Sequence, residues 1–163
     1  MGGGGPERRG FTLDYDLTAT EIITPVGVSE PYGTGLDDSS PVLARAGFDG
    51  VWDTGATCSV VSLRIVDDLR LAPIDRSFVE TASGTYDASV YLVALHLPGG
   101  IAVPAVRVID SPSIGGADVL IGMDIIGRGD FAVTNLAGRT RVSFEAPSTR
   151  RIVFAEDRSD PAP

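Results

Sequence analysis

The spacing of the apolar residues limits the possible folds of this chain more than any other feature. Residues 77–97, SFVETASGTYDASVYLVALHL, alternate apolar and polar side chains on both sides of a polar, glycine-containing centre at residues 81–87. Alternation with a period of two is typical of half-buried strands, and a polar turn between two such arms predicts a β-hairpin. Similar short runs, separated by Gly, Pro and Asp, predict further strands at residues 11–28 (two strands), 46–52, 101–109, 119–121 and 131–144. The sequence therefore predicts an all-β protein.

Two short segments depart from this pattern. A helical period begins after Ser59, at the apolar positions Val60, Val61, Leu63, Val66 and Leu69. A second brief helix is expected after Gly122, where an apolar run ends. Pro104 cannot donate a backbone hydrogen bond, so it predicts a sheet edge or a bulge in its strand. We expect one domain over residues 11–145, with flexible tails at residues 1–10 and 146–163.

Charge and residue inventory exclude several classes of function. A formal charge of −9 disfavours nucleic acid and anionic membrane surfaces as partners. No apolar stretch is long enough to span a bilayer, and residues 1–10 lack the apolar core of a signal peptide, so the expected location is the cytoplasm. All 13 basic residues are arginine, which excludes a phosphate-binding or Schiff-base lysine. One histidine, His96, and one cysteine, Cys58, cannot build a zinc finger or an intrachain disulfide.

The segment VWDTGA, residues 51–56, places a carboxylate at the end of a strand that reads as buried. Asp53 directly follows Val51 and Trp52, and an unpaired buried charge costs free energy. A lone Asp between a strand and a helix most often caps the helix or forms a turn. The other interpretation is acid–base chemistry, in which the carboxylate exchanges protons with a substrate or a water.

Together with two later segments, this tetrad resembles the active-site motif of the retropepsin-like aspartic proteases. The three segments are DTGA at residues 53–56, the flap-like TASGTYDASV at 81–90, and VLIGMDII at 119–126, in which two apolar residues precede a glycine. The helical segment at 62–71 and the closing hairpin look closer to the DNA-damage-inducible proteases and bacterial retropepsin-like proteins than to the compact viral enzymes. The resemblance covers roughly residues 20–145. It implies a single-lobe acid protease fold with one or two short helices, closed by homodimerisation.

The resemblance also implies roles for individual residues. Asp53 from each of two subunits would form a catalytic dyad, in which the ionised carboxylate activates a water and the protonated one donates to the peptide carbonyl oxygen. Thr54 and Gly55 would support the dyad. The implied substrate-binding residues are Ala56 and the flap residues Ala82, Ser83, Gly84, Thr85 and Tyr86, and the implied structural motif is Leu120, Ile121 and Gly122. Because the nucleophile is water, no metal or other cofactor is expected.

Two positions differ from the viral pattern. Viral members commonly carry an Asp just after the tetrad and an Arg just after the late glycine, and the two side chains pair. This chain has Thr57 and Met123 in those places. The dimer is therefore expected to be held together differently, and the terminal hairpin at residues 130–145 is the predicted candidate.

The function that follows is an aspartic endopeptidase that acts on polypeptides as a homodimer. One alternative is a catalytically silent homodimer of the same fold that binds an extended peptide by strand addition. Another is a protease that cuts only its own precursor. The remaining chemically active residues have plainer interpretations: Cys58 as a small buried residue, His96 as a strand-surface or hydrogen-bonded core residue, and Asp118 and Asp124 as a helix cap and a turn rather than a metal pair.

Overall fold

The computed structural model describes residues 8–33, 45–81 and 84–153. Its elements, in chain order, are β1 (Arg9–Asp14), β2 (Ile23–Ser29), β3 (Arg45–Trp52), β4 (Val60–Ser62), α1 (Leu63–Leu69), β5 (Asp75–Thr81), β6 (Gly84–Leu97), the 3₁₀ turn η1 (Pro98–Gly100), β7 (Ile101–Ser111), β8 (Val119–Ile121), α2 (Met123–Ile126), β9 (Asp130–Leu136) and β10 (Arg139–Ala146). Strands dominate and the two α-helices are short, so the predicted all-β class is confirmed. In the described part of the chain, no helix is both long and apolar enough to cross a membrane.

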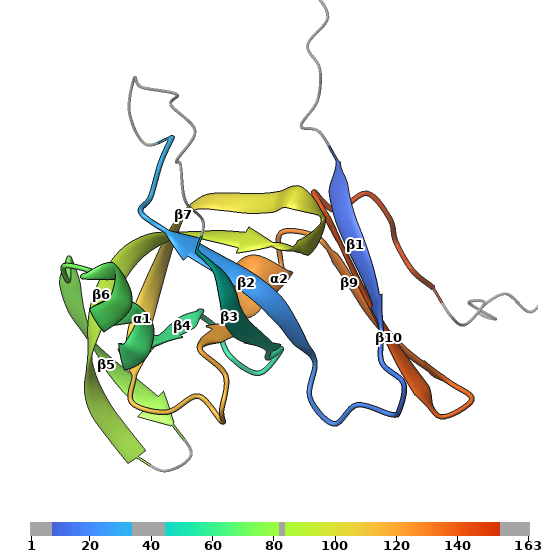
Figure 1. Cartoon of the computed structure of the whole chain (residues 1–163), viewed down its shortest axis with the longest axis horizontal. Helices are drawn as coiled ribbons and strands as arrows, with labels where there is room; N and C mark the ends of the chain where they lie inside the picture. Colours follow the sequence, from blue (N-terminus) through green and yellow to red (C-terminus); the bar gives the residue numbers. More distant parts are fainter. Residues whose placement is uncertain (1–7, 34–44, 82–83, 154–163) are drawn as a thin grey trace, which may run out of the picture.

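The strands form two sheets that lie side by side (Figure 1). The larger sheet has the order β2-β3-β8-β4-β7-β6-β5, and an additional pairing of β2 with β6 curls it back on itself. The smaller sheet has the order β1-β10-β9. The main core fills the curled sheet and extends to Phe144 of the smaller sheet.

A parallel pairing at the centre of the larger sheet determines where the chain after β3 can go. β8 pairs in parallel with β3, with Trp52 opposite Ile121, and antiparallel with β4 on its other side. The segment between β3 and β4 must therefore cross the end of β8. Asp53 is the first residue of this crossing, which we call the Asp53 loop (residues 53–59).

Several predicted elements are confirmed, and one predicted boundary, the start of the first helix, differs. Strands β5 and β6 form the predicted hairpin, whose residues 82 and 83 lie outside the described part of the chain. Pro104 lies at the predicted bulge, because the β6–β7 register shifts between Val93 and Leu95. The expected helical start at Val60 is wrong: Val60 pairs with Ile109 of β7 and Leu120 of β8, and the helix begins only at Leu63.

The smaller sheet includes residues that the sequence assigned to the tails. β1 begins at Arg9, which pairs with Ala146 of β10, so the domain boundary predicted at residue 11 falls inside a strand. The segment after β10 also contacts this sheet: the Asp130 carboxylate accepts hydrogen bonds from Ser148 Oγ and from the backbone amides of Thr149 and Arg150. These bonds hold the pKa of Asp130 below its usual value.

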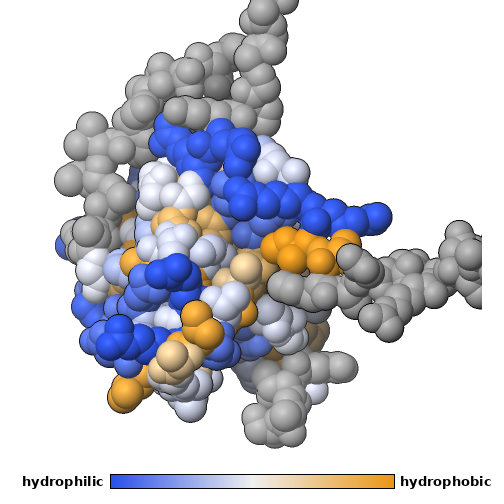
Figure 2. Space-filling model, turned by 90° about the vertical axis from the view of Figure 1, so that its right-hand side faces the viewer, coloured by the Kyte–Doolittle hydropathy of each residue, from blue (hydrophilic) through white to orange (hydrophobic). Residues whose placement is uncertain are grey.

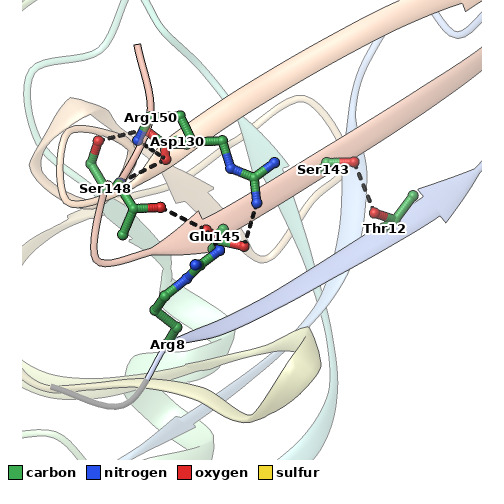
Figure 3. Close-up of polar contacts among 8 residues, drawn as sticks. Arg8, Thr12, Asp130, Ser143, Glu145, Ser148 and Arg150 are labelled. Atoms are coloured by element: carbon green, nitrogen blue, oxygen red, sulfur yellow. Dashed lines mark hydrogen bonds and ion pairs between the residues drawn. The ribbon is translucent and has the colours of Figure 1, made fainter. Parts of the chain in front are cut away.

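The outer face of the smaller sheet is polar. Figure 2 looks onto the side of the molecule where this sheet lies, and shows a mostly hydrophilic surface with separate hydrophobic patches. In Figure 3, Glu145 accepts hydrogen bonds from Arg8 and Arg150, and Thr12 is hydrogen-bonded to Ser143 on the neighbouring strand. Exposed ion pairs of this kind add little stability. Packing on the buried face of the smaller sheet must therefore supply most of its stability.

An aromatic cluster on that buried face joins the two sheets. The Trp52 ring stacks on Phe131 at 5.0 Å with an interplanar angle of 8°, and it packs obliquely against Phe144 at 5.0 Å and Phe11 at 5.9 Å. Trp52 Nε1 donates to Thr24 Oγ1 at 3.0 Å, so the indole N–H is satisfied although it is buried. Because Trp52 directly precedes Asp53, this cluster fixes the end of β3.

Truncating the centre of the cluster should destabilise the protein. Phe144 is 1% exposed, so Phe144→Ala should lower the free energy of unfolding by about 3–5 kcal/mol. Phe78→Ala, at a side chain 79% exposed on β5, is the matched control and should change it by less than about 1 kcal/mol. Urea unfolding at one protein concentration measures both. Equal losses would contradict the placement of Phe144 at the centre of the core.

Candidate active site

Asp53 lies where β3 ends, and its own loop orients its carboxylate. The backbone amide of Asp53 donates to the carbonyl oxygen of Ile121 at 3.0 Å, which continues the β3–β8 pairing by one residue. The amide of Gly55 donates to Asp53 Oδ1 at 2.8 Å. The residue is half-buried, so this carboxylate is both held by an N–H group and open to solvent.

The Asp53 loop is fastened to the segment that follows β8. The amide of Met123 donates to the carbonyl oxygen of Ala56 at 2.8 Å. The fully buried Ser59 hydroxyl accepts from the amide of Gly122 at 3.1 Å and donates to Asp124 Oδ1 at 2.8 Å. These bonds fix both ends of the crossing.

Glycine at position 122 is a requirement of this contact. A Cβ atom there would lie 2.6 Å from the carbonyl oxygen of Cys58 and 3.1 Å from that of Ala56. Both obstacles are backbone atoms, so any side chain would push the Asp53 loop away from β8. The apolar-apolar-glycine motif therefore has a local physical explanation in this fold.

An open cleft of about 980 Å³ begins at Asp53. Its floor includes Asp53 and Ala56, and one side is formed by Val79 and Tyr86 of the β5–β6 hairpin. Its apolar wall includes Val60, Ile109, Ile114 and Leu120, which belong to a second apolar cluster of the molecule. The cleft can therefore bring apolar groups next to a carboxylate.

The structure brings part of the predicted site together. Asp53, Gly55, Ala56, Tyr86 and Leu120 all line the cleft. The other predicted residues lie elsewhere: Thr54, Gly84 and Thr85 are exposed without lining it, Ile121 and Gly122 are buried beneath the Asp53 loop, and Ala82 and Ser83 lie outside the described residues.

Sequence reasoning missed two parts of the site. The first is the cleft lining contributed by Thr20–Ile22 before β2 and by the segment from Ile109 to Gly115. The second is Ser59, whose only signal was one polar residue beside an apolar run. Both parts depend on contacts between segments that are far apart in the sequence.

The other chemically active side chains have local roles. His96 is hydrogen-bonded to Ser29 Oγ at 2.9 Å and stacks on Tyr32, and burial lowers its pKa. Cys58 lines the cleft, and burial, together with the nearby Asp124 charge, raises the pKa of its thiol.

The two aspartates considered as a metal pair are also accounted for. Asp118 pairs with Arg64, and Asp124 accepts the Ser59 hydroxyl. The described residues contain no group of three or more side chains suited to holding a metal ion.

Comparison with known proteins identifies the fold. No family model and no curated protein matches the chain. A retropepsin-like aspartic protease from Rickettsia conorii matches with a TM-score of 0.52 and 10% identity, over 86% of this chain and 94% of that one. The EIAV protease complexed with the inhibitor HBY-793 matches with a TM-score of 0.51 and 16% identity, over 69% and 90%. The retroviral protease-like domain of Ddi1 from Leishmania major gives a TM-score of 0.43 at 16% identity, over 70% and 81%.

Identities of 10% and 16% establish shared architecture rather than shared activity. The match with the Rickettsia conorii protein extends over most of this chain and nearly the whole of that protein. The chain has the retropepsin-like fold.

Proposed function

We propose that the protein is an aspartic endopeptidase that hydrolyses polypeptides, with Asp53 of two subunits as its catalytic dyad. The observation that carries this proposal is a carboxylate oriented by the Gly55 amide at the end of β3, in a cleft of about 980 Å³. Two such carboxylates resist being ionised together, so one keeps a proton. The ionised one then activates a water, and the other donates its proton to the carbonyl oxygen of the scissile bond. The names of the EIAV and Rickettsia conorii proteases support this reaction class.

The cleft lining favours apolar residues beside the cut bond. Apolar substrate side chains that pack against the wall would remove apolar surface from water, which is favourable in free energy. The wall residues are Val60, Ile109, Ile114 and Leu120. Glu21 is the one other carboxylate in the described lining, which contains no arginine. A basic side chain near Glu21 would therefore bind better than an acidic one.

A second chain is needed because one chain supplies a single Asp-Thr-Gly sequence. A twofold axis between two Asp53 loops would complete the dyad. Within the predicted hairpin at residues 130–145, β10 is already paired on both sides, whereas β9 is an edge strand. β9 also presents Val133 and Leu136 with 42% and 81% of their surface exposed. We assign the subunit contact to β9, because an open strand edge and exposed apolar side chains suit pairing with a second copy.

Asp53→Asn should abolish peptide cleavage and leave the fold intact. The amide is nearly isosteric but cannot ionise, so kcat/KM for a cleaved library peptide should fall by about 10²–10⁴-fold or more. Asp16→Asn, at an exposed aspartate outside the cleft, is the matched control and should retain activity. Circular dichroism and thermal unfolding check the fold of both variants. Undiminished turnover by purified Asp53→Asn would refute the assignment, and a wild-type protein that binds peptides without cutting them would favour the silent alternative.

The pH profile of kcat/KM should be a bell with its maximum on the acidic side of neutral. The rate should fall when both carboxyl groups are protonated and again when both are ionised, and the two apparent midpoints belong to the pair. A thiol mechanism predicts the opposite trend: the raised pKa of Cys58 means that its thiolate forms only at high pH. Cys58→Ser should therefore keep the bell-shaped profile. A rate that rises steadily into the alkaline range and disappears in Cys58→Ser would contradict the proposal.

A dimer of one Asp53→Asn subunit and one wild-type subunit should be inactive. After free exchange in an equal mixture of Asp53→Asn and wild type, about half of all dimers are mixed and about a quarter are wild type on both sides. The mixture should then lose about half of the activity of its wild-type content, when measured above the dissociation constant. Pull-down through a tag on the mutant confirms the mixed dimers. Full activity in such dimers would show that one Asp53 is sufficient.

A further inference from the structure

A second cavity, which we call the α2 cavity, lies between the start of β7, the end of α2 and the end of β10. Its volume is about 480 Å³, and none of its lining residues lines the Asp53 cleft. Its walls include Ile101, Val103, Ile125 and Phe144, all of them buried. A cavity of this size and character can hold a small apolar group, since ligand pockets commonly measure about 300–1,000 Å³.

In the described lining of the α2 cavity, the two charged residues are both arginines. Arg128 is exposed, its Nε donates to the backbone carbonyl of Asp124 at 2.8 Å, and its guanidinium forms no ion pair within the described residues. Arg9 donates from Nη1 to the carbonyl oxygen of Gly100 at 2.8 Å. Among the described residues that line the cavity there is no aspartate or glutamate, although the chain has a formal charge of −9. The cavity is therefore a local cationic site on an acidic protein.

We propose that the α2 cavity binds a small amphiphilic carboxylate, meaning an apolar chain or side chain that ends in a carboxylate group. The apolar part would lie against Val103, Pro104 and Ala146, and the carboxylate would reach the guanidinium of Arg128. Arginine suits this role because its planar N–H groups match the geometry of a carboxylate. Two sources share this chemistry: a medium-chain fatty acid, and the terminal carboxylate of a short apolar peptide.

The position of α2 connects this cavity with the Asp53 loop. Ile125 and Arg128 line the cavity. The two residues before them are hydrogen-bonded to the Asp53 loop: the Met123 amide donates to the Ala56 carbonyl, and the Asp124 carboxylate accepts from the Ser59 hydroxyl. A ligand bound to Arg128 thus lies next to the four-residue helix that fastens the loop. Binding itself requires no catalysis, so the proposal stands or falls separately from the proposed peptidase activity.

The test compares ligand pairs that differ only in charge, added to the full chain. Sodium octanoate is titrated against octanamide, and N-acetyl-leucine against N-acetyl-leucinamide, by calorimetry and by methyl NMR. At least one carboxylate should bind saturably, shift the methyl signals of Val103 and Ile125, and bind about tenfold more tightly than its amide. Binding of octanoate alone identifies a fatty-acid-like ligand, and binding of N-acetyl-leucine alone identifies a peptide terminus.

Matched arginine variants assign the charge recognition to one residue. Arg128→Gln should weaken the binding of the carboxylate about tenfold and leave the binding of the amide unchanged. Unchanged binding of the amide also shows that the cavity is still folded. Arg76→Gln, at an exposed arginine of β5 outside the cavity, should have no effect. Equal affinity for acid and amide, shifts at Ile114 and Leu120 of the Asp53 cleft instead, or no saturable binding by either carboxylate would each overturn the proposal.

Discussion

The Asp53 loop depends on hydrogen bonds from a segment far along the chain. The carbonyl oxygen of Ile121 accepts a hydrogen bond from the Asp53 amide, the Gly122 amide donates to the Ser59 hydroxyl, and the Met123 amide donates to the Ala56 carbonyl oxygen. Each such bond contributes only about 0.5–1.5 kcal/mol net, but leaving the buried Ser59 hydroxyl or a loop carbonyl unpaired costs more. The close approach that makes these bonds also requires a residue without Cβ at position 122. The place of Asp53 is thus set by β8 and α2 as much as by β3.

This arrangement explains how a carboxylate can follow an apolar strand without a large desolvation penalty. Trp52 is 7% exposed and is enclosed by the aromatic cluster, whereas Asp53, one residue later, opens into the cleft. The Gly55 amide supplies a donor for one of its oxygens, and solvent reaches the side chain. The carboxylate is therefore oriented without being isolated in an apolar interior.

The sequence was sufficient where local pattern and tertiary environment agree. The β5–β6 hairpin, the Asp at the end of β3 and the bulge at Pro104 all depend on residues close together in the chain. β4 was misread because its three residues, read with α1, also fit a helical period, and only pairing with β7 and β8 makes Val60 and Val61 a strand. The cleft wall from Ile109 to Gly115 was missed for the same reason. It lines the cleft because it lies beside the Asp53 loop, and the sequence near Ile109 contains no pattern that predicts this contact.

The two sheets also differ in how they can meet a partner. The larger sheet is curled, with β2 paired to both β3 and β6, so among its described strands only β5 remains as an open edge. That strand belongs to the β5–β6 hairpin, which contributes Val79 and Tyr86 to the cleft. The smaller sheet leaves β1 and β9 as edge strands, and Phe11 of β1 and Phe131 of β9 both pack on Trp52, the residue before Asp53. A contact along either edge would therefore reach the end of β3 through one aromatic pair, and the stacked Phe131–Trp52 pair at 5.0 Å is closer than the Phe11–Trp52 pair at 5.9 Å.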